Sequence, residues 1–197
     1  AGTATIDNTT VSGNTANRAG GGLEAIGGSS TSIIGGSLED NVAGPSGSAV
    51  PGNGGAIHIS DDGSVDLTEV LVDGNTAASE GGGLWNSSTG TLVVTRSTIS
   101  SNVSIDGGGI FADGDGGAVT VVNSTIASNS ASNDGGGVLS EGGTVSLTSV
   151  TIADNSASLG GGISVEAGTL SLINSIVSRN NASTDSNLSG SFTDDGN

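Results

Sequence analysis

The chain is 197 residues long and contains 37 glycines, two prolines, one tryptophan, two phenylalanines and neither cysteine nor methionine. This composition excludes disulfide bonds and an aromatic core, so any core must consist of Val, Ile, Leu and Ala. Twenty acidic residues against three Lys and Arg give a net charge of −17. That balance excludes a basic surface of the kind that binds nucleic acid or anionic lipid.

Divalent cations, cationic partners or a salty medium suit so acidic a surface, and plain solubility is the alternative explanation. The sequence has no run of about 18 apolar residues, so we expect no membrane-spanning segment. It also lacks a charged start followed by an apolar stretch, so any secretion signal has been removed or lies outside the chain.

An internal repeat dominates the chain. Seven asparagines, each three residues after an apolar residue, recur at spacings of 27, 34, 27, 27, 26 and 25 residues. Glycine pairs or triplets form a second series at the same period, and each of them leads into an apolar residue. The asparagines are Asn14, Asn41, Asn75, Asn102, Asn129, Asn155 and Asn180; the glycines precede Leu23, Ile57, Leu84, Ile110, Val138 and Ile163. Two linked series at one period are typical of a repeat protein.

Each repeat begins with a segment in which apolar and polar residues alternate, as in a strand with one buried face. In residues 91–95, for example, Leu92 and Val94 alternate with more polar neighbours. The predicted inward pairs in chain order are Ala4 and Ile6, Thr31 and Ile33, Val65 and Leu67, Leu92 and Val94, Val119 and Val121, Val145 and Leu147, and Leu170 and Leu172.

Two further strands follow in each repeat, the second carrying residues such as Ile99 and the third residues such as Ile110. Strands this short cannot bury an apolar face alone, so consecutive repeats must stack, each strand pairing in parallel with its counterpart one repeat on. We therefore predict an all-β fold: a parallel β-helix of about seven coils of 25–27 residues, with three short strands per coil, forming one domain over residues 1–197. The asparagines predict an inward hydrogen-bonded ladder that satisfies buried turn backbone.

One repeat is longer than the others. Between Asn41 and Asn75 the spacing is 34 residues, and the excess contains both prolines, Pro45 and Pro51. Because proline cannot donate to a strand ladder, we predict an inserted surface loop at about residues 42–53. Loops on rigid scaffolds often carry binding chemistry, although a neutral insertion is the simpler interpretation.

The combination of an Ile-x-x-Asn element (Ile99 to Asn102) with a Gly-Gly-small-Ile element (Gly107 to Ile110) resembles the repeats of polymorphic outer-membrane proteins. It resembles more closely the wider group of secreted bacterial proteins with pectate-lyase-like β-helices, because the first element here lacks the Phe of the outer-membrane family. The resemblance implies a right-handed helix, as the general bias of parallel crossovers also suggests. It further implies a secreted or surface location and a scaffold or adhesive role, while fold alone does not transfer activity.

Acidic residues align at one corner of the expected solenoid. Asp113, Glu141 and Glu166 fall in one column on successive coils, with Asp115 beside them. Like charges about 5 Å apart repel and raise one another's pKa, and a hard cation with several oxygen ligands would relieve them. We therefore expect a calcium site here, with screened repulsion at an exposed corner as the alternative.

Three aromatic side chains align one position after the third-strand apolar residue. His58, Trp85 and Phe111 lie on neighbouring coils and are expected to point to solvent. Such a ridge could stack on a sugar ring or pack against a partner protein. The alternative is that the loop at residues 42–53 covers it.

The outward positions of the first strand, such as Thr91, Val93 and Thr95, form a face of small residues that resembles the threonine arrays of ice-binding proteins. Lateral packing against another solenoid is the alternative, and Thr is also an ordinary residue of exposed strands. The three arginines occupy different columns, two of them aligned with acids, which disfavours the single cationic site of a polysaccharide lyase.

These features favour a non-enzymatic, secreted or surface-exposed bacterial protein with a structural or adhesive role. Because neither end offers a recognisable cap, we expect either a segment of a larger protein or end-to-end stacking into a filament. The alternatives are a carbohydrate-binding or polysaccharide-active β-helix and, less directly, an ice-binding protein.

Overall fold

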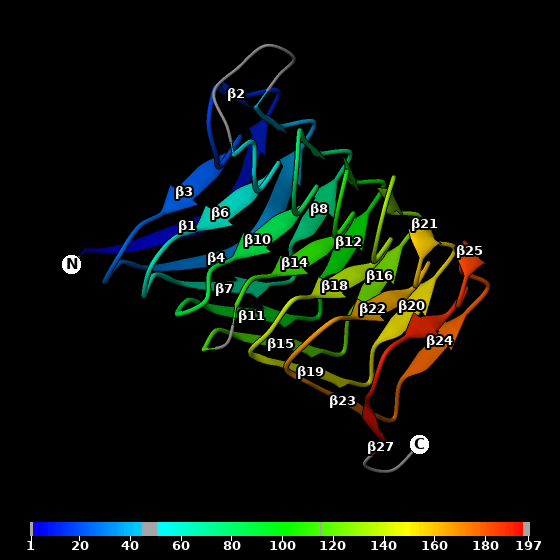
Figure 1. Ribbon diagram of the computed structural model, residues 1–197. Helices are drawn as coiled ribbons and strands as arrows, with labels where there is room; N and C mark the ends of the chain where they lie inside the picture. Colours follow the sequence, from blue (N-terminus) through cyan, green and yellow to red (C-terminus); the bar gives the residue numbers. More distant parts are fainter. Residues whose placement is uncertain (1, 45–50, 115, 195–197) are drawn as a thin grey trace.

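The computed structural model describes residues 2–44, 51–114 and 116–194. Within these ranges every regular element is a β-strand, and the strands stack into a parallel solenoid of seven coils (Figure 1). Among the described residues we find no helix long and apolar enough to cross a membrane. The predicted fold class, an all-β parallel β-helix, is confirmed.

The strands form three sheets. The first sheet has 13 strands: β1 (Thr3–Ser12), β4 (Ser30–Glu39), β7 (Ser64–Thr68), β8 (Leu71–Asp73), β11 (Thr91–Thr95), β12 (Thr98–Ser100), β15 (Ala118–Val122), β16 (Thr125–Ala127), β19 (Thr144–Thr148), β20 (Thr151–Ala153), β23 (Thr169–Ile173), β24 (Ile176–Ser178) and β27 (Thr193–Asp194).

The other two sheets have seven strands each. The second sheet comprises β2 (Thr15–Ala16), β5 (Val42–Ala43), β9 (Thr76–Ala77), β13 (Val103–Ser104), β17 (Ser130–Ala131), β21 (Ser156–Leu159) and β25 (Asn181–Thr184). The third sheet comprises β3 (Leu23–Ala25), β6 (Ile57–Ile59), β10 (Leu84–Asn86), β14 (Ile110–Ala112), β18 (Val138–Ser140), β22 (Ile163–Val165) and β26 (Leu188–Ser189).

The sheets divide differently from the three predicted strand columns. The first and second predicted columns belong to one sheet, because β4 runs through the bend at Gly35 and Gly36 without interruption and pairs with both β7 and β8. The second sheet corresponds to no predicted column. It is made of strands such as β13, which has only two residues and directly follows Asn102. So short a strand has no alternation that could reveal it in the sequence.

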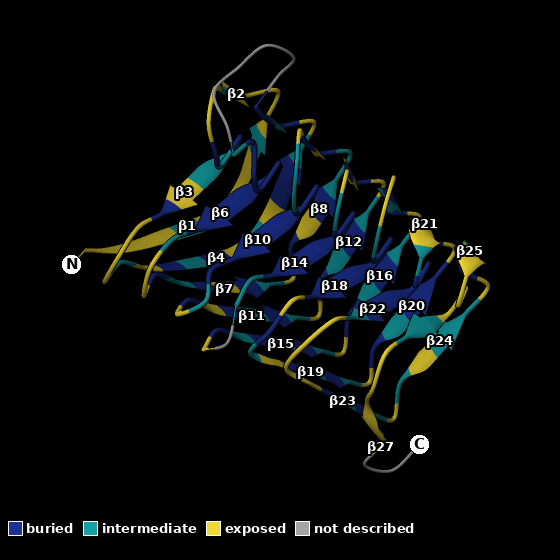
Figure 2. Ribbon diagram, in the orientation of Figure 1, coloured by how far each residue is buried: buried dark blue, intermediate teal, exposed yellow. Residues whose placement is uncertain are grey.

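The core lies inside the coils, where the inward residues of each strand stack in register. Leu92, for example, pairs with Val65 on one side and Val119 on the other. Nearly all of these residues are completely buried, and together with the inward residues of the third sheet they form one continuous cluster (Figure 2). In the first coil Ala4 is exposed and Ile6 half-buried. Since the interior is narrow, it accommodates Val, Ile and Leu in a single column.

The long repeat adds its residues at one point of the second sheet. Asn41 and Asn75 are 34 residues apart, whereas Asn75 and Asn102 are 27 apart, a difference of seven that corresponds to residues 45–51. Gly44 and Gly52 lie against each other at the base of this insertion, since a Cβ on Gly44 would lie 2.5 Å from the Gly52 Cα. Residues 45–50, which make up half of the predicted loop at 42–53, lie outside the described residues.

Candidate functional site

The seven repeat asparagines line the interior as a ladder. From Asn14 to Asn155, the backbone N–H and the side-chain Nδ2 of each rung donate to the Oδ1 of the asparagine one coil on; for Asn102 and Asn129 these distances are 3.0 and 2.9 Å. The same Nδ2 also donates to the carbonyl of an apolar residue one coil back, Val72 in the case of Asn102. From Asn41 to Asn155 the rungs are at most 1% exposed. This part of the ladder is therefore a structural feature that is closed to solvent, while Asn14 in the first coil is exposed.

The expectation that His58, Trp85 and Phe111 point to solvent is wrong. These residues are only 4%, 9% and 1% exposed. Trp85 and Phe111 form a second apolar cluster with Leu139, outside the main core. The imidazole of His58 stacks on the indole of Trp85 with ring centroids 4.4 Å apart, and the Trp85 and Phe111 centroids are 6.4 Å apart. An aromatic ridge that could bind a sugar is therefore not available on this surface.

The cover over these side chains includes the turn of their own coil. The first glycine of each triplet lies directly against the outward residue of the following strand: a Cβ on Gly81 would lie 2.9 Å from the Trp85 Cβ, and one on Gly107 would lie 2.9 Å from the Phe111 Cβ. Because these glycines also have positive φ, only glycine lets the chain pass this closely.

A second column of acids borders this cluster, and sequence inspection did not identify it. Glu80, Asp106 and Asp134 each precede a glycine triplet, and they follow one another at the same position on successive coils: Glu80 pairs with Asp106, and the N–H of Asp134 donates to Asp106 Oδ1 at 3.2 Å. Glu80 Oε2 accepts hydrogen bonds from Trp85 Nε1 and Asn53 Nδ2, both at 2.8 Å. The signal in the sequence is an acid immediately before each of three glycine triplets.

The predicted column of Asp113, Glu141 and Glu166 is also present. The N–H of Glu141 bonds to the carbonyl before Asp113, and the N–H of Glu166 bonds to the carbonyl before Glu141, both at 2.9 Å, which places the three on successive coils. Asp115 lies outside the described residues. Among the residues that the structure describes, no group of three or more Asp, Glu, His or Cys side chains is arranged to hold a metal ion; calcium binding stays a prediction.

The two acidic columns repel each other. We call Glu80, Asp106, Asp113, Asp134, Glu141 and Glu166 the acidic corner. Loss of hydration raises the pKa of Glu141 to about 7, and the charges of Glu166, Glu80, Asp113 and Asp106 add to the increase. Loss of hydration also raises the pKa of Glu166, and Asp134 contributes both by charge and by a side-chain hydrogen bond. Glu141 and Glu166 therefore hold protons more tightly than ordinary carboxyl groups do.

His58 lies in a separate polar cluster near the first coil. Burial lowers the pKa of His58 to about 4, and the nearby Arg18 guanidinium contributes to the decrease. Arg18 Nη2 lies 2.9 Å from Glu24 Oε1, and the same oxygen lies 3.6 Å from His58 Nδ1. At neutral pH the imidazole is therefore uncharged and stacks on Trp85. The two arginines that align with acids in the sequence both form ion pairs: Arg96 with Glu69 at 2.9 Å, and Arg179 with Asp154 at 2.5 Å.

Part of the outer surface of the first sheet carries no charged side chain. We use the name neutral face for a surface made of the outward residues of eight strands: β11, β12, β15, β16, β19, β20, β23 and β24. These eight strands contain no Asp, Glu, Lys, Arg or His, although the chain carries a net charge of −17. Arg96, in the bend between β11 and β12, borders the face and is paired with Glu69.

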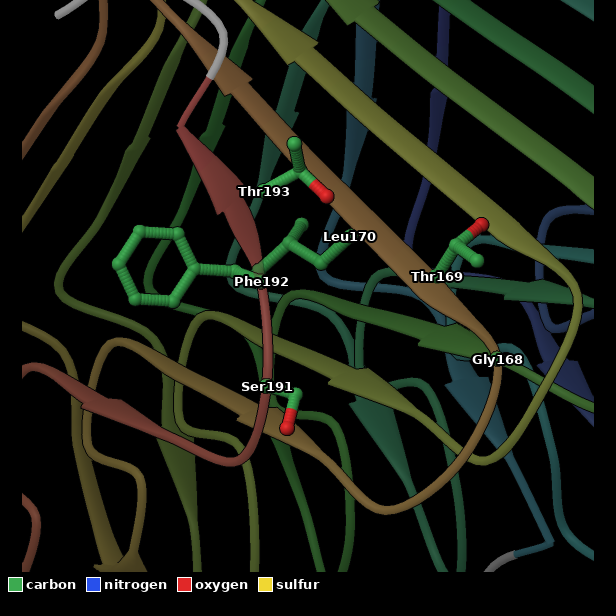
Figure 3. Close-up of a pocket in the computed structure, with 6 residues that line it drawn as sticks. All are labelled: Gly168, Thr169, Leu170, Ser191, Phe192 and Thr193. Carbon is green, nitrogen blue, oxygen red and sulfur yellow. The ribbon is translucent and has the colours of Figure 1, made fainter.

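The residues of the neutral face are small and lie in register. Thr91, Ala118, Thr144 and Thr169 form one column, and Thr98, Thr125 and Thr151 form another. At its far end a shallow pocket lies between the start of β23 and the chain entering β27, lined by Gly168, Thr169, Leu170, Ser191, Phe192 and Thr193 (Figure 3). Figure 3 shows the Phe192 ring pointing away from Leu170, and Phe192 is 48% exposed.

Comparison of the chain with protein-family models, with curated proteins and with solved structures finds no match in any of the three.

Proposed function

We propose that the protein is a rod-shaped, non-enzymatic protein with a structural or adhesive role outside the cell, at a bacterial surface. We further propose that it binds other copies of itself laterally, through the neutral face. The observation that supports this proposal is the absence of charge from two stacks of four strands, β11 to β23 and β12 to β24, in a chain of net charge −17. Where acidic side chains lie on the surface, mutual repulsion opposes contact between two such molecules. On the neutral face, two rods can approach without placing an unpaired charge in the interface.

The shape of the face also suits lateral contact. Strands about 4.8 Å apart in a parallel sheet present small side chains as a regular surface, and Thr, Ser, Ala and Val lose little side-chain entropy when they are covered. The unbroken core and the asparagine ladder support the same proposal, because they hold all coils in one register and so keep the face intact over its whole length.

Sedimentation velocity over a range of protein concentrations tests the proposal. We expect the parent chain to associate as the concentration rises and the double variant Thr120→Asp, Ser146→Asp to remain monomeric, because these two residues pair in the middle of the face. The matched control is Thr76→Asp, Val103→Asp, which places the same two charges at an exposed pair on the second sheet. The control should associate as the parent does.

A parent chain that is monomeric at every concentration would remove self-association from the proposal. Equal loss of association in both double variants would assign the effect to net charge and not to the neutral face. Circular dichroism of each variant shows whether the fold is retained.

Ice binding is a second candidate, and the in-register threonine columns favour it. Thermal hysteresis of the parent, compared with that of the same two double variants, tests it directly. Hysteresis that the Thr120→Asp, Ser146→Asp variant loses and the control retains would support ice binding at the neutral face. A parent without hysteresis would exclude it.

A further inference from the structure

The asparagine ladder ends in an exceptional way. Up to Asn155, each rung donates to an asparagine that lies a full coil further along the chain. Asn180 instead donates to Asn187, which is only seven residues on: its backbone N–H lies 3.3 Å and its Nδ2 3.2 Å from Asn187 Oδ1. Asn187 thus accepts the same two bonds that the next rung would accept.

Asn187 occupies a position that is glycine in the four preceding coils and alanine, Ala56, in the coil before those. The N–H of Ile163 donates to the carbonyl of Asn187, just as the N–H of Val138 donates to the carbonyl of Gly162, and Ile163 pairs with Leu188. Position 187 is therefore the counterpart of Gly162 one coil on. The corresponding residues two, three and four coils earlier are Gly137, Gly109 and Gly83.

The residues at this position beside an internal rung are glycine or, in Ala56, alanine. A Cβ would lie 3.2 Å from the amide nitrogen of Asn102 at Gly83, 3.1 Å from that of Asn129 at Gly109, and 2.7 Å from that of Asn180 at Gly162. A side chain larger than a methyl group would need the space that the rung occupies. At position 187 the side chain itself fills that space.

We propose that Asn187 is a terminal rung that closes the asparagine ladder, so that no further coil, from this chain or from another copy, can continue the ladder past Asn180. Asn180 is 7% exposed, and without an acceptor its two donors would be left unpaired, which is unfavourable for buried polar groups. Asn187 removes that penalty within its own coil. The strands that surround it, β25 and β26, pair with β21 and β22 and hold it in place.

The role of Asn187 differs chemically from that of an internal rung. The two bonds from Asn180 need only an acceptor at position 187. Asn129, by contrast, must also donate through Nδ2 to Asn155 Oδ1 and to the carbonyl of Ile99, both at 3.0 Å. A carboxylate can replace the amide at position 187 and cannot replace it at position 129.

Hydrogen exchange followed by NMR tests the proposal, because the backbone amide of Asn180 itself donates to Asn187. In Asn187→Ala we expect exchange of this amide to accelerate about tenfold or more, the loss of one to two net hydrogen bonds, while the Asn129 amide keeps its protection. In Asn187→Asp the Asn180 amide should remain protected. Asn181→Ala, an exposed residue in the same coil, is the control and should leave both amides unchanged.

Two outcomes would overturn the proposal. One is an Asn180 amide that exchanges at the parental rate in Asn187→Ala, since the side chain would then contribute no acceptor. The other concerns thermal stability, which can be read even where the alanine variant does not fold: Asn187→Asp should melt close to the parent and Asn129→Asp far below it. Equal decreases in the two aspartate variants would show that Asn187 acts as an ordinary internal rung.

Discussion

At the scale of single residues, the solenoid depends on side chains that are small or absent. The first glycine of each triplet lets the chain fold back over its own next strand, and that cover buries Trp85 and Phe111. Sequence periodicity predicted correctly that these aromatics face away from the core. It could not predict their burial, because a period-two pattern says which face a residue is on and nothing about what packs over that face.

Replacing Gly107 by Ala tests this cover. Gly107 and Gly13 both have positive φ, +60° and +65°, but a Cβ at Gly107 would lie 2.8 Å from the Ile110 carbonyl oxygen and 2.9 Å from the Phe111 Cβ, whereas one at Gly13 would meet nothing within 4 Å. Gly13→Ala should therefore lower the unfolding free energy only by the strain of alanine in the left-handed conformation, about 1–2 kcal/mol. Gly107→Ala should lower the unfolding free energy by a further ~1–3 kcal/mol, because its Cβ also overpacks the turn.

Chemical denaturation of the two variants measures the difference, and Gly13→Ala is the control for backbone strain. Equal losses of unfolding free energy in the two variants would contradict the proposed close packing at Gly107.

At the scale of elements, the alternation of apolar residues was sufficient to predict β11 and its counterparts, and the recurring asparagine was sufficient to predict the ladder. The second sheet could not be predicted, because strands such as β13 have two residues and no pattern. The acidic column that begins at Glu80 was missed for a related reason. An acid before a glycine is typical of a solvated turn, and only the stacking of coils brings Glu80, Asp106 and Asp134 to the side of Asp113, Glu141 and Glu166.

The acidic corner predicts how stability depends on pH. The pKa of Glu141 is raised to about 7 from its ordinary value of 4.5, so its protonation favours the folded state. The resulting stability is fully present below pH 4.5 and is lost as the pH rises to 7. His58 acts in the opposite sense: its pKa is lowered from 6.5 to about 4, so its contribution is lost as the pH falls through that range.

Glu141→Gln separates the two groups, because it leaves His58 unchanged. We expect the variant and the parent to melt at the same temperature near pH 4.5, and the variant to melt at a higher temperature at pH 8. Thermal melting monitored by circular dichroism at both pH values checks this, with the acidic measurement as the internal control. A difference between variant and parent that does not change with pH would contradict the assignment to Glu141.

At the scale of the whole molecule, charge and shape are linked. The chain has 20 acidic residues and three arginines, so mutual repulsion opposes the compact rod. The repeat period alone predicted the rod, because each coil contacts only its neighbours and the same contacts recur. The whole extent of the neutral face could not be predicted from the sequence. It forms only where the stack of β11, β15, β19 and β23 is combined with the stack of β12, β16, β20 and β24.

Salt should stabilise the rod. Raising NaCl from about 0.01 to 0.1 M shortens the screening length from about 30 to about 10 Å, which is less than the length of the stacked coils. We therefore expect the melting temperature to rise over this range, and to rise less in Glu141→Gln, where one repelling charge is missing. Replacing NaCl by KCl is the control and should give the same curve. A melting temperature independent of salt would show that the charges are too far apart to oppose folding.

The asparagine ladder also gives the rod a dipole along its axis. Every rung from Asn14 to Asn180 turns its amide the same way, with Oδ1 toward the first coil and Nδ2 toward the last. Side-chain amides carry dipoles, and seven aligned in a dry interior add up along the axis. Two rods lying against each other favour opposed dipoles. Contact through the neutral face should therefore be antiparallel about a two-fold axis, which closes after two molecules and does not grow into a layer.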